Sequence, residues 1–296
     1  MRGEARKGGG RLRIPSPAKV NLLLRVAGRR PDGYHELETV MQTLEFADTV
    51  ELERIPSGVE LVCDSAGVPS GPENLAWKAA EGFFAASGAP GGVRIVLHKR
   101  IPPGGGLAGG SSNAAAVLAG LQELYGTPLP PSDLASLAAG IGSDVAFFLQ
   151  GGTCLCRGRG ERVEPLPDPG PLFFVLLLPP FSCPTGEVYR RFRPSDSTPP
   201  AAFREALNRM LAGGEDPGAW LLNDLERAAR RAVPELDRFM AEIEVAGLEG
   251  LRVSGSGSTL FRAFYREEEA LRFRKKAAAA LEGRHVGVLS TRRRAR

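Results

Sequence analysis

The feature that most restricts what this chain can fold into is a glycine-rich segment, residues 102–113, which reads PPGGGLAGGSSN. It contains five glycines and runs into an apolar, alanine-rich stretch, Ala114 to Leu124, whose composition predicts a helix. Such a turn can direct several backbone N–H groups at one anion, and a helix N-terminus adds a partial positive charge. The segment therefore predicts a phosphate-binding loop for a nucleoside triphosphate.

Three other interpretations of this loop compete with that prediction. Gly104, Gly106 and Gly109 satisfy the G-x-G-x-x-G pattern of dinucleotide-binding proteins, but six residues separate them from the preceding strand pattern, 94–97, and no second strand ending in an acid follows. A Walker loop needs a lysine at the helix start, where this chain has only glycine and serine. A glycine turn without a ligand stays open, although ordering so many small residues costs conformational entropy.

Composition and charge exclude several classes of protein. The chain has 296 residues, 43% of them hydrophobic and 24% charged, which is ordinary for a globular protein large enough for two domains. Its longest apolar run, residues 171–181, is far short of the roughly 20 residues that cross a bilayer, and predicts a buried strand. The net charge of +4 sits largely at the two ends, which we expect to be solvated, so neither a nucleic-acid nor a membrane partner is predicted.

The ends and the cysteines bear on location and metals. Residues 1–11 contain no apolar stretch of the kind found in a signal peptide, which predicts a cytoplasmic protein. The four cysteines and three histidines show no zinc-ligand spacing, so we expect reduced thiols and no protein metal site.

Strand and helix patterns alternate without the regular period of a parallel barrel, which predicts an α+β fold. Charged, glycine and proline residues accumulate over 157–170 and indicate a domain boundary. Strands are expected at 19–26, 39–46, 49–54, 58–63, 93–98, 145–149, 172–178 and 285–289, and helices at 75–86, 114–124, 133–139, 202–211, 219–231, 235–246 and 267–281.

Two segments combine polar side chains with apolar surroundings. Because side chains alternate along a strand, Lys19 and Asn21 are expected to share one face while Leu22 and Leu24 take the other. Asp144 precedes the apolar run 145–149, which suggests a carboxylate at the edge of a buried strand. Burial of an unpaired carboxylate is costly, so a cationic partner is expected, and Lys19 is one candidate. A solvated lysine and a turn or capping role for Asp144 remain open.

Taken together, these pieces resemble the GHMP kinase superfamily. The similar stretches are residues 16–22 (SPAKVNL), 31–37 (PDGYHEL), 103–113 and 142–145 (GSDV), while residues 254–258 (SGSGS) resemble its third motif. The first two stretches are similar to a branch whose substrate carries a cytidine diphosphate, and differ from mevalonate and homoserine kinases. The resemblance implies an N-terminal lobe like domain 2 of ribosomal protein S5 over residues 11–166, a ferredoxin-like lobe over 167–296, and an active site between them.

The resemblance also implies the reaction and its catalytic residues. ATP with Mg²⁺ would phosphorylate a hydroxyl of a small-molecule substrate in a monomer or homodimer. Asp144 would take the hydroxyl proton and Lys19 would neutralise charge, with Asn21 beside the substrate. Phosphoryl transfer depends more on positioning and charge stabilisation than on a strong base, which suits such a pair. Another GHMP kinase, a nucleotide-binding protein without catalysis and an NAD-dependent oxidoreductase are the competing functions.

Positions matching the family's binding residues complete the prediction. Tyr34 would stack on cytosine, His35 would read its edge, and Tyr189 would form the opposite wall with Thr185 nearby, although relatives often have phenylalanine at position 189 and proline where this chain has Gly186. The candidate ATP-binding residues are Asn74, Lys99, Pro103, Gly104, Gly105, Gly106, Leu107, Ala108, Gly109, Gly110, Ser111, Ser112 and Asn113, and the third glycine motif contributes Gly255, Ser256 and Gly257.

Some of these assignments have plain structural alternatives. Asn74 could be only a helix cap, Lys99 only a solvated strand end, and Tyr34 and His35 ordinary loop residues. Ala108 stands where many relatives have glycine, and it should be tolerated unless that position needs a positive φ. No acid matches a magnesium ligand, so the metal is assigned to the triphosphate, with Ser112 as a possible protein ligand.

Overall fold

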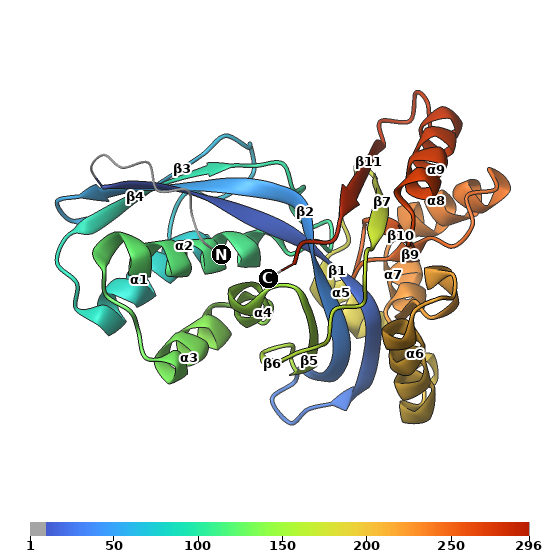
Figure 1. Ribbon diagram of the computed structural model, residues 1–296, viewed down its shortest axis with the longest axis horizontal. Coiled ribbons are helices and arrows are strands. Elements are labelled where there is room, and N and C mark those ends of the chain that lie inside the picture. The colour runs from blue at the N-terminus through green and yellow to red at the C-terminus, as the bar shows by residue number, and fades with distance from the viewer. Residues whose placement is uncertain (1–9, 296) are drawn as a thin grey trace.

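Two long antiparallel strands, β1 (Arg11–Arg29) and β2 (His35–Ile55), run through the larger of two lobes and reach the smaller one (Figure 1). The computed structural model describes residues 10–295, so the predicted solvated arm at residues 1–9 and the last arginine lie outside the described residues. Each lobe is built on its own sheet with helices packed against it. The predicted α+β fold in two lobes is confirmed.

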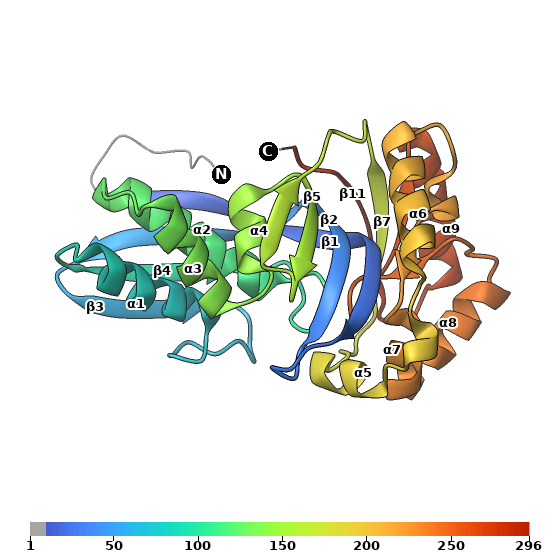
Figure 2. The same cartoon turned by 90° about the horizontal axis from the view of Figure 1, so that it is seen from below.

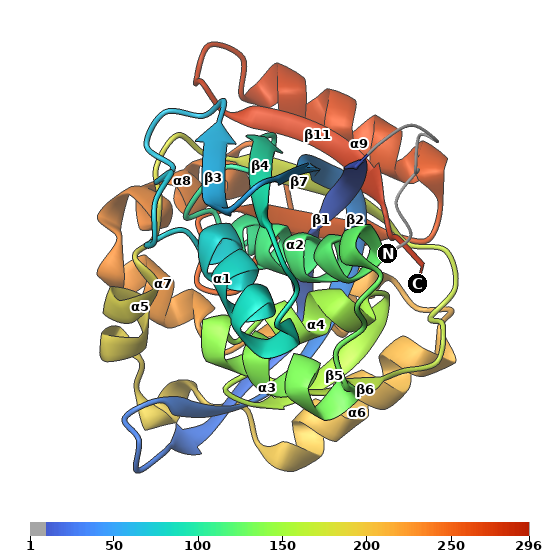
Figure 3. The ribbon, with the colours of Figure 1, turned by 90° about the vertical axis from the view of Figure 1, so that its left-hand side faces the viewer.

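The larger lobe is a seven-stranded sheet whose main path runs β3-β4-β2-β1-β8, with β5 joining β2 and β6 joining β5. Four helices belong to it, and α1 and α2 lie side by side under β3 and β4 (Figure 3). Its remaining strands are β3 (Gly58–Cys63), β4 (Gly92–His98), β5 (Thr153–Gly158), β6 (Arg162–Pro165) and β8 (Leu222–Asn223), and its helices are α1 (Leu75–Ser87), α2 (Gly109–Tyr125), α3 (Pro131–Ile141) and α4 (Val145–Gln150).

The smaller lobe is a four-stranded sheet in the order β11-β7-β10-β9, with helices stacked along its outer side (Figure 2). Its strands are β7 (Phe173–Leu178), β9 (Arg252–Val253), β10 (Leu260–Phe264) and β11 (Gly287–Arg292). Its helical segments are α5 (Thr185–Arg191), η1 (Pro194–Asp196), α6 (Pro200–Ala212), η2 (Pro217–Ala219), α7 (Glu226–Ala232), α8 (Pro234–Val245) and α9 (Glu267–Ala280).

Strand β7 explains the longest apolar run of the sequence. Phe174 and Leu176 belong to a core cluster shared with β1 and α6, whereas Val175 and Leu177 belong to a cluster shared with α8 and α9. Both faces of the strand are therefore buried, and a strand buried on both faces is continuously apolar instead of alternating. The predicted buried strand is confirmed.

Several predicted elements differ in type or extent. The strands expected at 39–46 and 49–54 are the single strand β2, and the strand expected at 19–26 extends over all of β1. The run after Asp144 is the short helix α4 and not a strand, because a five-residue apolar stretch has no period that separates the two. The predicted helix 219–231 starts on the last residue of η2 and includes the short strand β8, and helix α7 begins only at Glu226. Helix α2 begins at Gly109, five residues earlier than expected, so part of the glycine-rich segment is its first turn.

Contacts across the predicted lobe boundary join the two halves of the chain. Strand β8 pairs in parallel with β1, and Arg293 forms a bridge with Leu44 of β2. Arg292 pairs with Glu267 and Arg293 with Asp168. The Arg292 side chain is still 54% exposed, as a solvated tail implies, whereas the Arg293 side chain is only 17% exposed. The division at residue 166 stays a prediction. Within residues 10–295, no helix has the length and apolar character needed to span a bilayer.

Candidate active site

A cavity of about 1400 Å³ lies where the two lobes meet. The glycine-rich loop, β1 and the start of β2 come from the larger lobe, while the start of α5 and the turn at Gly255 come from the smaller one. Of the predicted site residues, those that line the cavity are Lys19, Asn21, Tyr34, His35, Asn74, Lys99, Pro103, Gly104, Gly105, Gly106, Ala108, Gly109, Gly110, Ser111, Asn113, Asp144, Thr185, Tyr189, Gly255 and Ser256. Leu107, Ser112 and Gly257 are not part of the lining.

The glycine-rich loop curls around the N-terminus of α2. Gly109, Gly110 and Ser111, the first residues of that 17-residue helix, line the cavity, so their N–H groups stand at the wall of the space. Leu107 instead points into the core, with 1% of its surface exposed, and anchors the loop. Helix N-terminus and loop together form the kind of concave amide surface that binds phosphates.

Ser112 does not fit the role of a metal ligand. Its side chain is fully buried and accepts a hydrogen bond from the Ser16 hydroxyl at 2.8 Å. Ser111, one residue earlier, faces the cavity. On a helix, neighbouring residues point about 100° apart, so only one of the two serines can face the ligand.

Ala108 adopts the left-handed conformation, with φ of 54°, immediately before helix α2. Position 108 therefore needs a positive φ, and alanine is strained there. An L-residue with a side chain loses about 1 kcal/mol or more in this region. We expect Ala108→Gly to raise the free energy of unfolding by about 0.5 kcal/mol, because glycine relieves this strain but gains entropy in the unfolded chain. Urea denaturation measures the change, and a destabilised variant would contradict it.

Lys19 and Asp144 meet at the centre of the cavity wall. The Lys19 ammonium donates to Asn21 Oδ1 at 2.7 Å and to the Gly106 carbonyl at 2.9 Å, and lies 3.8 Å from Asp144 Oδ2. Asp144 occupies the N-cap position of α4, yet its side chain makes no capping hydrogen bond. The carboxylate is one quarter exposed and remains available to a ligand.

An irregularity in β1 decides which residues share this wall. The register with β2 shifts between Asn21 and Leu23, so the expected alternation is broken there. Leu22 and Leu23 lie in the same core cluster, whereas Leu24 lines the cavity with Lys19 and Asn21. The prediction that Lys19 and Asn21 share a face is confirmed, and the placement of Leu24 opposite them was wrong because a bulge reverses the alternation.

Burial lowers the pKa of Lys19 below its ordinary value of 10.5, and the neighbouring Asp144 carboxylate opposes the shift. In the pH range just below 10.5 the unfolded chain therefore binds more protons than the folded protein, and stability contributed by this group rises with pH. We expect the stability of the parent protein, relative to a Lys19→Met variant, to increase as pH rises from 8 toward 10. Chemical denaturation of both proteins along that series tests it, and a constant difference contradicts it.

The predicted cytosine-binding residues lie at one end of the cavity, but their rings pair differently from expectation. His35 stacks on Tyr189, with ring centroids 4.9 Å apart and an interplanar angle of 28°. Tyr34 is 55% exposed and carries the Arg159 guanidinium 4.8 Å from its ring centre. The hydroxyls of Thr185 and Ser256 lie 3.0 Å apart and join α5 to the third glycine motif.

Asn74 and Lys99 also line the cavity. Asn74 caps helix α1 by accepting from the Ala76 N–H at 2.9 Å, and it also lines the cavity, so the capping and ligand-facing interpretations coexist. Lys99 is not a solvated strand end, because its side chain is only 6% exposed and pairs with Asp48.

Sequence reasoning missed Asp48, a carboxylate with no exposed side-chain surface. A signal was present, since Leu44, Phe46, Asp48, Val50 and Leu52 alternate along β2 and all five are buried. An acid on the apolar face of an alternating strand indicates a buried polar contact. What it contacts could not be inferred from that pattern.

The protein combines two lobes that meet at a cavity with a glycine-rich loop at a helix N-terminus and an amine beside a carboxylate. This combination is typical of one class of small-molecule kinases. The chain matches the GHMP kinases N terminal domain over residues 74–152 and the GHMP kinases C terminal domain over residues 200–283.

Individual relatives narrow the class. The chain is 44% identical, over 82% of its length and 86% of the relative's, to the 4-diphosphocytidyl-2-C-methyl-D-erythritol kinase of Pelotomaculum thermopropionicum, and 46% identical over 83% and 85% to that of Thermus thermophilus. A crystal structure of 4-(cytidine 5'-diphospho)-2C-methyl-D-erythritol kinase superposes with a TM-score of 0.77 at 40% identity, covering 95% of this chain and 99% of that one. The chain belongs to the 4-diphosphocytidyl-2-C-methyl-D-erythritol kinase family of GHMP kinases.

Proposed function

We propose that this protein transfers the γ-phosphoryl group of ATP to the 2-hydroxyl of 4-diphosphocytidyl-2-C-methyl-D-erythritol, a step of the non-mevalonate route to isoprenoid precursors. The observation that carries the proposal is the position of Lys19, whose ammonium contacts the glycine-rich loop and lies beside Asp144 in one cavity. A nucleotide held by the loop and an alcohol held near Asp144 would meet at that ammonium.

The loop and the start of α2 supply the grip on the triphosphate. Their N–H groups and the helix dipole favour the negative charge that spreads over the transferring phosphoryl group. When bound, Mg²⁺ neutralises charge on the phosphates. Among residues 10–295 no cluster of three or more His, Cys, Asp or Glu side chains could hold a metal, so the ion would rely on phosphate oxygens and water, as Mg²⁺ commonly does. Ser111 is the helix-start serine placed to add an oxygen.

Asp144 is the proposed acceptor of the hydroxyl proton. Its side chain is not committed to capping α4, and the Lys19 ammonium 3.8 Å away would stabilise the alkoxide character that develops on the attacking oxygen. Because the transition state of phosphoryl transfer is loose, alignment of the two substrates contributes more than basicity.

The cytidine end of the substrate is assigned to Tyr34, His35 and Tyr189. Burial and the nearby Arg29 lower the pKa of His35, so the imidazole is neutral at pH 7 and presents one donor and one acceptor to a base edge. Since His35 and Tyr189 are already stacked, a cytosine would enter on the Tyr34 side or separate the two rings.

A coupled assay of ADP release tests the proposal. The protein is incubated with ATP, Mg²⁺ and 4-diphosphocytidyl-2-C-methyl-D-erythritol, in parallel with mevalonate, homoserine and galactose. Turnover is expected only with the cytidyl substrate. Turnover with one of the other acceptors would move the chain to another branch of the superfamily, and ATP binding without any turnover would favour a non-catalytic protein.

A cytoplasmic location and a monomeric or homodimeric state belong to the same proposal. Size-exclusion chromatography with light scattering tests the oligomeric state.

A further inference from the structure

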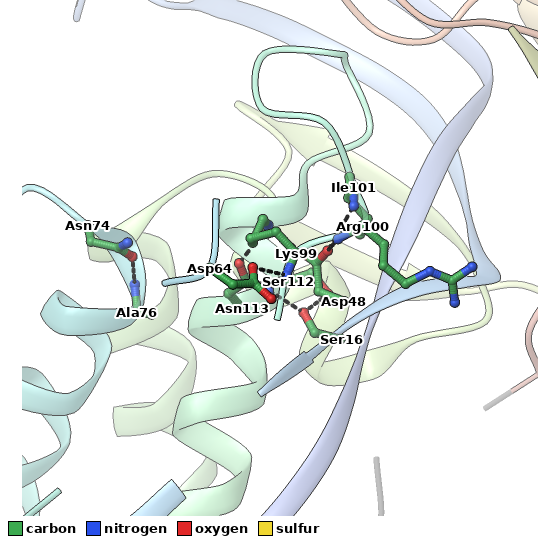
Figure 4. A network of polar contacts seen from close by, with 10 residues as sticks. All are labelled: Ser16, Asp48, Asp64, Asn74, Ala76, Lys99, Arg100, Ile101, Ser112 and Asn113. Carbon is green, nitrogen blue, oxygen red and sulfur yellow. Dashed lines mark hydrogen bonds and ion pairs between the residues drawn. The ribbon is translucent and has the colours of Figure 1, made fainter. Parts of the chain in front are cut away.

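The buried carboxylate of Asp48 lies at the centre of a polar network under the glycine-rich loop (Figure 4). Its Oδ1 accepts the backbone N–H groups of Arg100 and Ile101 at 2.7 and 2.8 Å. Its Oδ2 accepts the Lys99 ammonium and the Asn113 side-chain amide, the latter at 3.1 Å. Four donors therefore converge on one carboxylate, which satisfies the charge that burial would otherwise penalise.

These partners stand at the two ends of the loop. Ile101 immediately precedes the segment 102–112, and Asn113 follows it in the first turns of α2. Asp48 comes from neither end but from the middle of β2. The Asp48 side chain thus connects the start of the loop to its end. Its hydrogen bonds hold these two ends at a fixed distance from each other.

The same carboxylate fixes the position of Lys99. The ammonium donates to Asp48 and to Asn113 Oδ1 at 3.0 Å, which leaves one of its three donors without an acceptor among the described residues. It lies 3.2 Å from the point where a Cβ on Gly109 would stand, against the first residue of α2, and Lys99 lines the cavity. The remaining donor is therefore available to a nucleotide bound in the cavity.

We propose that Asp48 is a positioning residue for nucleotide binding, acting through Lys99 and through both ends of the glycine-rich loop without touching the ligand. This inference rests on the proposed use of ATP. It predicts that the charge of Asp48 matters for ATP affinity and not for the acceptor substrate. None of the Asp48 hydrogen bonds reaches Lys19, Asn21 or Asp144, and the Gly106 carbonyl that holds Lys19 is tied separately by the Ser254 hydroxyl.

The variant Asp48→Asn tests the positioning role of Asp48, because it removes the charge and keeps the shape of the side chain. The new side chain keeps an oxygen for the Arg100 and Ile101 N–H groups but turns an amide donor toward the Lys99 ammonium, so the lysine loses its anchor. We expect the Kd for ATP, measured by calorimetry without an acceptor, to rise about tenfold or more, because charged hydrogen bonds in buried sites are worth that much. In turnover assays the KM for ATP should rise likewise, with kcat and the KM for the acceptor within about threefold of the parent values.

Asp224→Asn is the matched control. Asp224 is equally buried and accepts three hydrogen bonds, from the Val26 N–H at 2.9 Å, the Thr198 N–H at 3.0 Å and the Thr198 hydroxyl at 2.6 Å, but it contacts no part of the loop. Asp224→Asn should lose stability as Asp48→Asn does, because each change removes a buried charge that accepts several hydrogen bonds. The Kd of Asp224→Asn for ATP should nevertheless stay within about twofold of the parent value. Equal ATP affinity in Asp48→Asn and the parent, or an equal loss in both variants, would overturn the proposal.

A milder variant decides the matter if Asp48→Asn cannot be purified in a folded state. Ser16 accepts the Asn113 amide at 2.8 Å, donates to the Ser112 hydroxyl at 2.8 Å and lies outside the cavity lining, so Ser16→Ala loosens the same network by two hydrogen bonds. ATP affinity should fall about threefold, and an unchanged Kd would count against the network. If the parent protein itself binds no ATP, the proposed function fails, which is a different outcome from unaltered binding in the variants.

Discussion

Replacing Asp144 by asparagine is expected to lower kcat by about 10²- to 10⁴-fold, the range that a positioned proton acceptor contributes. The change preserves the size of the side chain and removes only its ability to take a proton and to face Lys19 with a negative charge. Since the carboxylate makes no capping hydrogen bond to α4, the local fold should persist. The Kd for ATP should change less than about threefold, because the loop that is proposed to bind the triphosphate does not contact Asp144.

Steady-state kinetics and calorimetry on the same preparation separate these two effects. Asp133→Asn provides the control, since Asp133 is an exposed acid in the first turn of α3 in the same lobe. Its kcat should equal that of the parent. A loss of less than tenfold in Asp144→Asn would show that the proton leaves by another route and that Asp144 serves only to pair with Lys19.

Gly106→Ala should have the second large effect, and here the cause is the backbone. Gly106 has a φ of 74°, and a Cβ at this position would lie 2.2 Å from the Ser254 carbonyl oxygen and 2.9 Å from the Gly257 carbonyl oxygen. Those atoms belong to backbone and cannot rotate away. The Gly106 carbonyl also accepts hydrogen bonds from Lys19 and from the Ser254 hydroxyl, so displacement of the loop would move the ammonium that is proposed to be catalytic.

We expect Gly106→Ala to lose about 3 kcal/mol of unfolding free energy, from left-handed strain together with the clash, and to retain less than about 1% of kcat/KM. Gly110→Ala is the control in the same segment, because Gly110 lies within α2 and a Cβ there would meet only Leu75, at 3.8 Å. Its stability should be unchanged or slightly higher. Denaturant unfolding compares the two, and a Gly106→Ala protein within about 1 kcal/mol of the parent would disprove the close-packing argument.

Local sequence signals were sufficient for most elements of the fold and for the glycine-rich turn that leads into α2. The apolar run of β7, the alanine-rich helices and the glycine-rich turn are features whose physical causes act over a few residues. Such causes include periodicity, the entropy of glycine and the fixed φ of proline. The resemblance to known kinases extended the prediction to the roles of Lys19 and Asp144. Their charged groups lie 3.8 Å apart, which agrees with the pairing expected from the cost of burying a carboxylate.

Short apolar stretches mark the limit of this local reasoning. The run after Asp144 is a helix although five apolar residues carry no period that predicts one, and packing against the rest of the lobe decided its type. The bulge between Asn21 and Leu23 likewise left no trace in composition, yet it placed Leu24 on the cavity side. Whether Ala108 adopts a positive φ depends on how the loop closes onto α2.

The sequence by itself determined that this chain would build two α+β lobes and a glycine-rich loop opening a helix, because chain geometry and hydrophobic periodicity act between near neighbours. Only the tertiary structure decided that Asp48, far from the loop in sequence, would anchor both its ends, and that the His35 ring would stack on Tyr189. Such contacts arise from packing between distant segments, where a buried polar group takes whichever partner the fold brings within hydrogen-bonding distance.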